Sequence, residues 1–157
     1  MPRRKRVYKN REFLKADPKF GNVLLSKFIN QIMVDGKKSV AQRLMYDALD
    51  KVSKKTKNDP ILVFDTAMRN VSPVLEVKAR RVGGANYQVA IEVRGDRKET
   101  LAMRWLKDAA RSRSGRGMAD KLAAEIIDAS NREGGAIKKR EDVQRMAEAN
   151  RAFSHFA

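Results

Sequence analysis

Residues 75–93 read LEVKARRVGGANYQVAIEV, and this stretch decides the fold because its periodicity changes from that of the segments before and after it. Apolar and polar side chains alternate on both sides of the glycine pair Gly83-Gly84. Strict alternation on either side of a glycine turn is typical of two antiparallel strands joined by a short loop. The sequence therefore predicts a β-hairpin over residues 74–94.

The faces of the two strands bear on the length of the loop. A loop of the two glycines alone would place Lys78 and Arg80 on the same face as Tyr87. A three-residue loop that also contains Ala85 places the apolar side chains of both strands together and the charged ones opposite. Because this second arrangement separates the two kinds of side chain more cleanly, we predict the three-residue loop or an equivalent bulge.

The remainder of the chain shows the spacing of amphipathic helices, interrupted by residues that start or stop a helix. Gly36 ends the first segment, Pro60 opens the third, and Asp96 followed by Glu99 reads as a capping box for the fourth. The expected helices span about 20–34, 38–54, 60–71, 96–110, 118–131 and 137–153. The sequence thus predicts a mainly α protein, with a single domain over 1–157 that contains six helices and one hairpin.

The composition is strongly basic. The 157 residues include 35 Lys and Arg against 19 Asp and Glu, a formal net charge of +16. Nucleic acid is the expected partner of such a chain, because bound cations release the counterions of the phosphates. Residues 1–17 form a basic N-terminal arm, and no apolar run follows it that would suggest a signal peptide or membrane span. We therefore expect a cytoplasmic protein with no membrane contact.

Catalytic and metal-binding patterns are missing from the sequence. There is no cysteine, and the one histidine, His155, has no serine and carboxylate partners in the pattern. Most carboxylates are interleaved with Lys and Arg, which favours local ion pairs on solvated helices. We predict that the protein is not an enzyme and has no metal and no cofactor.

The charge is unevenly distributed along the chain. Residues 76–116 contain eleven Lys or Arg and five Asp or Glu, whereas 119–133 contain two basic and four acidic residues. We predict that the arm, the hairpin and the loop around 111–117 form the RNA side, and that the fifth helix faces solvent or protein. The predicted RNA-binding residues are Arg3, Arg4, Lys5, Arg6, Arg11, Lys37, Lys38, Lys78, Arg80, Arg81, Gly83, Gly84, Arg94, Arg111, Arg113, Arg116, Lys138, Lys139 and Arg140.

Four segments, in order along the chain, resemble bacterial small-subunit ribosomal protein seven: 27–39, 75–89, 138–142 and 146–153. The resemblance implies six helices with a protruding hairpin arm and a C-terminal helix and tail over 137–157. It implies a structural constituent of the small ribosomal subunit that binds the 3′ major domain of its ribosomal RNA and nucleates assembly of the head. It further implies a hairpin near the messenger RNA path and exit-site transfer RNA, with ribosomal proteins nine and eleven as neighbours.

Two other functions fit parts of the pattern. Short basic helices also suit a DNA-binding or architectural protein, but the positive charge here is spread over several elements and not placed on one recognition helix. An RNA-modifying enzyme would need a cofactor pocket, for which the sequence offers no glycine fingerprint or metal set. Among the cations, Arg80 is expected to contact phosphate, and Arg81, on the other face, to stack or reach a second strand.

Overall fold

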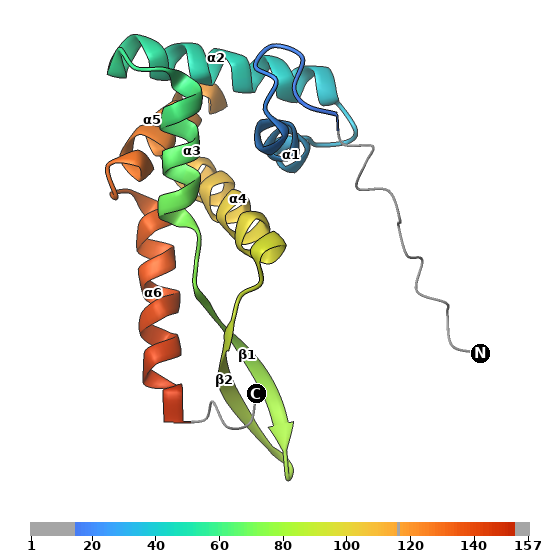
Figure 1. Cartoon of the computed structure of the whole chain (residues 1–157), viewed down its shortest axis with the longest axis vertical. Helices are drawn as coiled ribbons and strands as arrows, with labels where there is room; N and C mark the ends of the chain where they lie inside the picture. Colours follow the sequence, from blue (N-terminus) through green and yellow to red (C-terminus); the bar gives the residue numbers. More distant parts are fainter. Residues whose placement is uncertain (1–14, 116, 153–157) are drawn as a thin grey trace, which may run out of the picture.

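The structure is a computed structural model that describes residues 15–115 and 117–152. Over these residues it contains six helices and one two-stranded antiparallel sheet (Figure 1). The elements are α1 (Val23–Ile32), α2 (Lys38–Thr56), α3 (Pro60–Val71), β1 (Leu75–Val82), β2 (Ala85–Glu92), α4 (Gly95–Ser112), α5 (Met118–Ser130) and α6 (Gly135–Ala149). The predicted mainly α architecture with a hairpin is confirmed.

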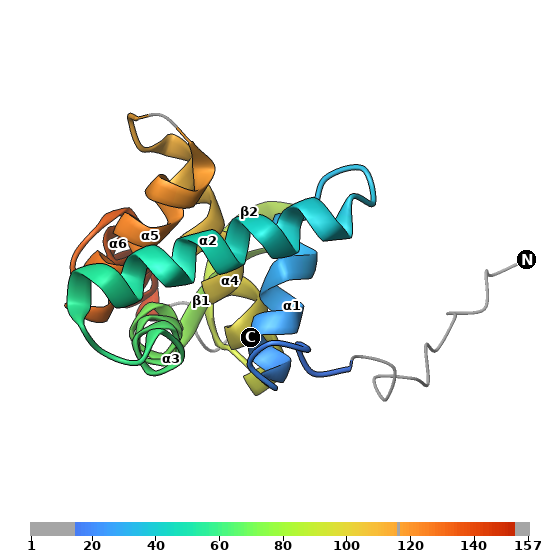
Figure 2. The same ribbon diagram turned by 90° about the horizontal axis from the view of Figure 1, so that it is seen from above.

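The hydrophobic core lies around α5, which packs against α2, α3 and α4. Leu122 and Ile126, spaced four residues apart on α5, are fully buried, as their helical spacing predicts. Phe28 of α1 and Phe64 of α3 add a pair of buried rings whose centroids are 5.3 Å apart. Seen from above, α2 lies across the other helices and closes the core on that side (Figure 2).

The hairpin and α6 extend in the same direction, away from α2 (Figure 1). α6 also packs against β1, so the arm is supported along one side by a helix. At the base, Val93 N–H donates to the carbonyl of Val74 at 2.9 Å, which extends the pairing just beyond the strands. The pairing of the two chain segments thus reaches the base of the arm, and packing against α6 supports the arm from the body.

The prediction that Asp96 caps α4 is wrong. Helix α4 begins at Gly95, Arg94 occupies the cap position without a side-chain hydrogen bond, and Asp96 lies within the first turn. The pairing of Val93 in the hairpin leaves only Arg94 between sheet and helix, so the chain enters the helix earlier than expected. Asp96 still carries a negative charge at the end of the helix where the macrodipole favours one.

The predicted three-residue hairpin loop is also wrong. Val82 pairs with Ala85 and Arg80 pairs with Tyr87, so the loop is Gly83-Gly84 alone. Both glycines have positive φ, 57° and 90°, which gives the backbone the twist that a two-residue hairpin loop requires. The argument from faces failed because the described side chains of residues 79–88 are exposed except for the half-buried Tyr87, so no buried face among them imposes a register.

We expect the substitution Phe64→Ala to lower the free energy of unfolding by about 3–5 kcal/mol, because it leaves a cavity beside Phe28. Urea denaturation followed by circular dichroism measures the change. Leu62→Ala is the control on the same helix, since Leu62 is 63% exposed and its truncation should cost within about 0.5 kcal/mol. Equal losses in the two variants would contradict this placement of the core.

Candidate nucleic-acid interface

Several predicted RNA-binding residues lie outside the part of the chain that the structure describes. These are Arg3, Arg4, Lys5, Arg6, Arg11 and Arg116. The last residue of the predicted arm, Asp17, is 2% exposed and accepts a hydrogen bond from the hydroxyl of Tyr46 at 2.7 Å. Burial together with this bond raises the pKa of Tyr46 to about 12. The segment 15–17 is thus fixed to α2 at Asp17.

The hairpin presents its predicted cations to solvent. Lys78, Arg80 and Arg81 are exposed, and Gly83 and Gly84 are exposed at the turn. Because alternate residues of a strand point to opposite faces, Arg80 shares a face with Lys78 and Arg81 lies on the other. The arm therefore offers positive charge on both faces, which suits contact with two segments of a polyanion.

A buried carboxylate ties the base of the hairpin to α4. Glu76 is 9% exposed, and its two oxygens contact Lys78 Nζ at 2.7 Å and Arg97 Nε at 3.3 Å. Burial by itself would raise the pKa of Glu76, but the hydrogen bonds and charges of Lys78 and Arg97 outweigh it and hold the pKa below its ordinary value. This carboxylate joins β1 to α4. The exposed Arg94 precedes α4 at the same base.

The turn between α1 and α2 comes together with the end of α4. Lys37, in this turn, and Lys38, the first residue of α2, are exposed. Lys37 lines a hollow of about 200 Å³ with Arg111. The rest of the hollow is largely apolar and includes Met118 and Val40. Val40 is 59% exposed, so this apolar lining is open to solvent. The fold thus joins two predicted sites, Lys37 and Arg111, that are far apart in the sequence.

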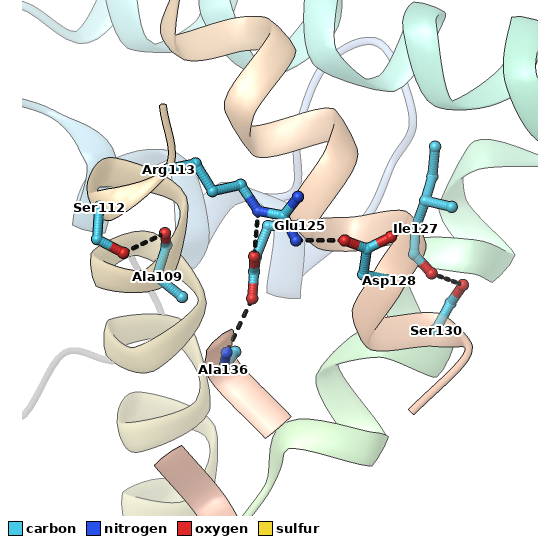
Figure 3. Close-up of polar contacts among 8 residues, drawn as sticks. All are labelled: Ala109, Ser112, Arg113, Glu125, Ile127, Asp128, Ser130 and Ala136. Atoms are coloured by element: carbon cyan, nitrogen blue, oxygen red, sulfur yellow. Dashed lines mark hydrogen bonds and ion pairs between the residues drawn. The ribbon is translucent and has the colours of Figure 1, made fainter. Parts of the chain in front are cut away.

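Arg113 lies inward, unlike the exposed Arg111. Its guanidinium forms ion pairs with Glu125 through Nε and with Asp128 through Nη2 (Figure 3). Burial by itself would lower the pKa of Arg113, but the bonds to Asp128 and Glu125 raise it above its ordinary value. Its side chain is 28% exposed, and these two carboxylates compensate its positive charge within the protein. Arg113 therefore anchors the loop that follows α4 to α5.

The fifth helix was predicted to face solvent or protein, but its residue Glu125 is buried within the protein. It is 1% exposed, and its second oxygen accepts the backbone N–H of Ala136 at 2.8 Å (Figure 3). A Cβ on Gly134 would lie 3.0 Å from this carboxylate, and Gly134 has φ +95°. A side chain at position 134 would therefore be both strained and crowded. The carboxylate joins the end of α4, the middle of α5 and the start of α6.

The basic residues of α6 also include both exposed cations and one that is bound within the protein. Lys138 and Lys139 are exposed on the helix, whereas Arg140 is half-buried. Nη1 of Arg140 donates to the carbonyl of Asn70 at the end of α3. The two lysines are placed to contact a partner, and Arg140 holds α6 against α3.

Sequence reasoning missed Arg97, Lys55 and Lys121. Arg97 lies between Asp96 and Glu99, which were interpreted as a capping box, so it was not considered as a contact residue. Its contact with Glu76 in the structure shows its role at the hairpin base. Lys55 and Lys121 lie together on a hollow beside the loop after α4, although they are 66 positions apart in the chain. No local pattern signals such a pair, because helix packing creates it.

Residues 15–115 and 117–152 contain neither a metal-binding cluster nor a membrane-spanning helix. No cluster of three or more His, Cys, Asp or Glu there has the proximity to hold a metal ion. No helix in this range is both long and apolar enough to cross a membrane. Ion pairs such as Arg113–Glu125 join neighbouring elements, and exposed predicted cations lie on the hairpin, at the turn before α2 and on α6.

A basic helical domain with exposed cations on a projecting hairpin belongs to the general class of nucleic-acid-binding proteins. Residues 2–151 match the family described as Ribosomal protein S7p/S5e. The chain is 60% identical over 156 residues to small ribosomal subunit protein uS7 of Moorella thermoacetica, and 61% and 62% identical to those of Teredinibacter turnerae and Methylibium petroleiphilum. Each match covers 99% of both chains.

The chain belongs to the S7p/S5e family of ribosomal proteins, which confirms the resemblance of its sequence. It is accordingly a structural and non-enzymatic protein, and RNA binding is general in this family.

We expect Glu76→Gln to lower the stability of the protein by about 1 kcal/mol at neutral pH, because it weakens two charged contacts whose cations are partly exposed. A carboxylate with a lowered folded pKa stabilises the fold above its ordinary value of 4.5 and loses that effect as pH falls through the folded value. The difference between wild type and variant should therefore be constant near neutrality and shrink below about pH 4.5. Urea midpoints measured against pH test this, with the exposed Glu92→Gln as control; a pH-independent difference would contradict it.

We expect Glu125→Ala to lower the free energy of unfolding by about 3 kcal/mol, because it leaves Arg113 and the N–H of Ala136 without their buried acceptor. Asp128→Ala is the matched control, since the Asp128 side chain is 39% exposed and its carboxylate pairs with no cation other than Arg113 among the described residues. Its cost should be at most about 1 kcal/mol. Combining Glu125→Ala with Arg113→Ala should cost less than the sum of the two. Chemical denaturation provides all the values, and equal costs for the two acids would refute the central role of Glu125.

Proposed function

We propose that this chain is a structural constituent of the small ribosomal subunit and binds its ribosomal RNA. The observation that carries the proposal is the hairpin, an arm fixed at its base by Glu76 and exposing Arg80 and Arg81 on opposite faces. Exposed guanidinium groups on a fixed arm can bind phosphates with two hydrogen bonds each. The names of the relatives support assembly into the small subunit.

We further propose that the chain is a primary binder of the 3′ major domain of this RNA and nucleates assembly of the head. Its hairpin would lie near the messenger RNA path and the exit-site transfer RNA, with ribosomal proteins nine and eleven as neighbours. The resemblance of the sequence motivates these finer assignments. The separation of the exposed cations over the hairpin, the α1–α2 turn and α6 supports a protein that holds several RNA helices at one junction.

Recognition on this proposal is mainly of RNA shape. A-form RNA presents phosphates and 2′-hydroxyls more readily than the edges of its paired bases. The exposed candidates Lys37, Lys38, Lys138 and Lys139 are flexible point charges suited to phosphates in many positions. Arg113 and Arg140 differ from them, because their guanidinium groups bind protein carboxylates or carbonyls. We therefore assign these two arginines the role of positioning neighbouring cations.

A basic DNA-binding protein would place its cations on one recognition helix. Here the exposed predicted cations lie on the hairpin, at the turn before α2 and on α6. Competition between structured small-subunit ribosomal RNA and duplex DNA at equal salt tests the choice. We expect the RNA to compete far more strongly, and equal competition would overturn the RNA assignment. Sedimentation of tagged protein with small subunits, before and after a salt wash, tests stable incorporation into the particle.

We expect Arg80→Ala to weaken binding to small-subunit ribosomal RNA and to reduce the salt dependence of log K by about one ion contact. Arg43→Ala is the control, because Arg43 is an exposed arginine of α2 and its removal changes the net charge equally. Binding constants measured over a range of potassium concentrations give both slopes. An unchanged slope for Arg80→Ala, or an equal change in both variants, would sink the assignment of a phosphate contact to Arg80.

A further inference from the structure

A polar hollow of about 430 Å³ lies between the end of α2, the loop after α4 and the start of α5. Its lining consists of Lys55, Arg113, Ser114, Gly115, Asp120, Lys121 and Ala124. Three separate segments thus bring three cations and one carboxylate to a single concave surface. The hollow is distinct from the hairpin and from the apolar hollow beside Lys37.

The ion pairs around the hollow leave two of its cations uncompensated. Arg113 is bound by carboxylates of α5, and Asp120 is bound by Lys51 of α2. Lys55 and Lys121 have no ion-pair partner within the part of the chain that the structure describes. Two lysine side chains therefore line a hollow whose carboxylate is already paired, and the repulsion between their positive charges favours binding of an anion.

Favourable interaction with a helix macrodipole explains the position of Lys55 but not that of Lys121. Lys55 lies in the last turn of α2, where a cation complements the helix macrodipole. Lys121 lies near the N-terminus of α5, where its N–H donates to the carbonyl of Gly117 in the first turn. A cation is disfavoured near a helix N-terminus, so local helix electrostatics do not account for Lys121. An anion bound in the hollow would account for it.

We propose that this hollow binds one backbone phosphate of the ribosomal RNA, between the ammonium groups of Lys55 and Lys121. Ser114 adds a hydroxyl at the rim, and Arg113, anchored by Glu125 and Asp128, holds this loop over the hollow. Ammonium and hydroxyl donors match the oxygens of a phosphate. The inference rests on the proposed function, and it adds two lysines and a defined ligand group to the RNA-binding surface.

The test compares Lys55→Gln, Lys121→Gln and the double variant with Lys54→Gln. Lys54 is exposed one position away on α2 and does not line the hollow, so it controls for the loss of one charge. Binding to small-subunit ribosomal RNA is measured against potassium concentration, with urea midpoints to verify folding. We expect each hollow variant to lose about two- to fivefold in affinity and the double variant to reduce the salt slope by about one contact. Lys121→Arg keeps the positive charge that Lys121→Gln removes, so its affinity for the RNA should match that of wild type.

The outcomes separate the inference from the function on which it rests. If wild type binds the RNA selectively and Lys54→Gln weakens binding as much as Lys55→Gln and Lys121→Gln, only the overall charge matters and the hollow is not a phosphate site. If wild type shows no preference for ribosomal RNA, the proposed function itself fails. Competition by inorganic phosphate is a further measurement. If phosphate competes with the RNA for wild type but not for the double variant, the hollow is supported as a phosphate site. Equal competition in both proteins overturns it.

Discussion

The arrangement of the helices depends on one buried carboxylate, that of Glu125. It accepts hydrogen bonds from Arg113 at the end of α4 and from the N–H of Ala136 at the start of α6, so three helices meet at two oxygens. A charge without partners at 1% exposure would be very costly, and these contacts make the burial tolerable. Because α6 in turn packs against β1, the same carboxylate helps to set the direction of the hairpin.

The net charge of +16 makes the placement of each acid important. Glu76 and Glu125 are buried and hold cations at the junctions of elements, and Asp17 is buried where the basic arm meets α2. Glu125 binds the largely buried Arg113, whereas Glu76 binds Lys78 and Arg97, which stay about half exposed. The remaining positive charge lies on exposed elements, where a polyanion reduces its self-repulsion.

The sequence predicted the helices well because amphipathic spacing and breakers such as Pro60 are local signals. It failed where the deciding constraint is tertiary. The hairpin loop was mispredicted because the described side chains of residues 79–88 form no buried face that sets their register, Tyr87 being only half-buried. The twist of Gly83-Gly84 decides the register instead. Charge patterning located exposed candidates such as Arg111, but could not distinguish them from Arg113, whose partners on α5 become neighbours only after folding.

This difference between the two arginines has a consequence for RNA binding. A cation that must be ordered when it binds RNA loses conformational entropy, which reduces the affinity it provides. Arg113 removes part of that cost for its neighbours, because its ion pairs hold the loop in place before any RNA is present. Glu76 does the same for the hairpin by joining β1 to α4. Recognition of RNA shape, as proposed above, requires fixed distances between exposed cations, and these ion pairs fix the elements that carry such cations.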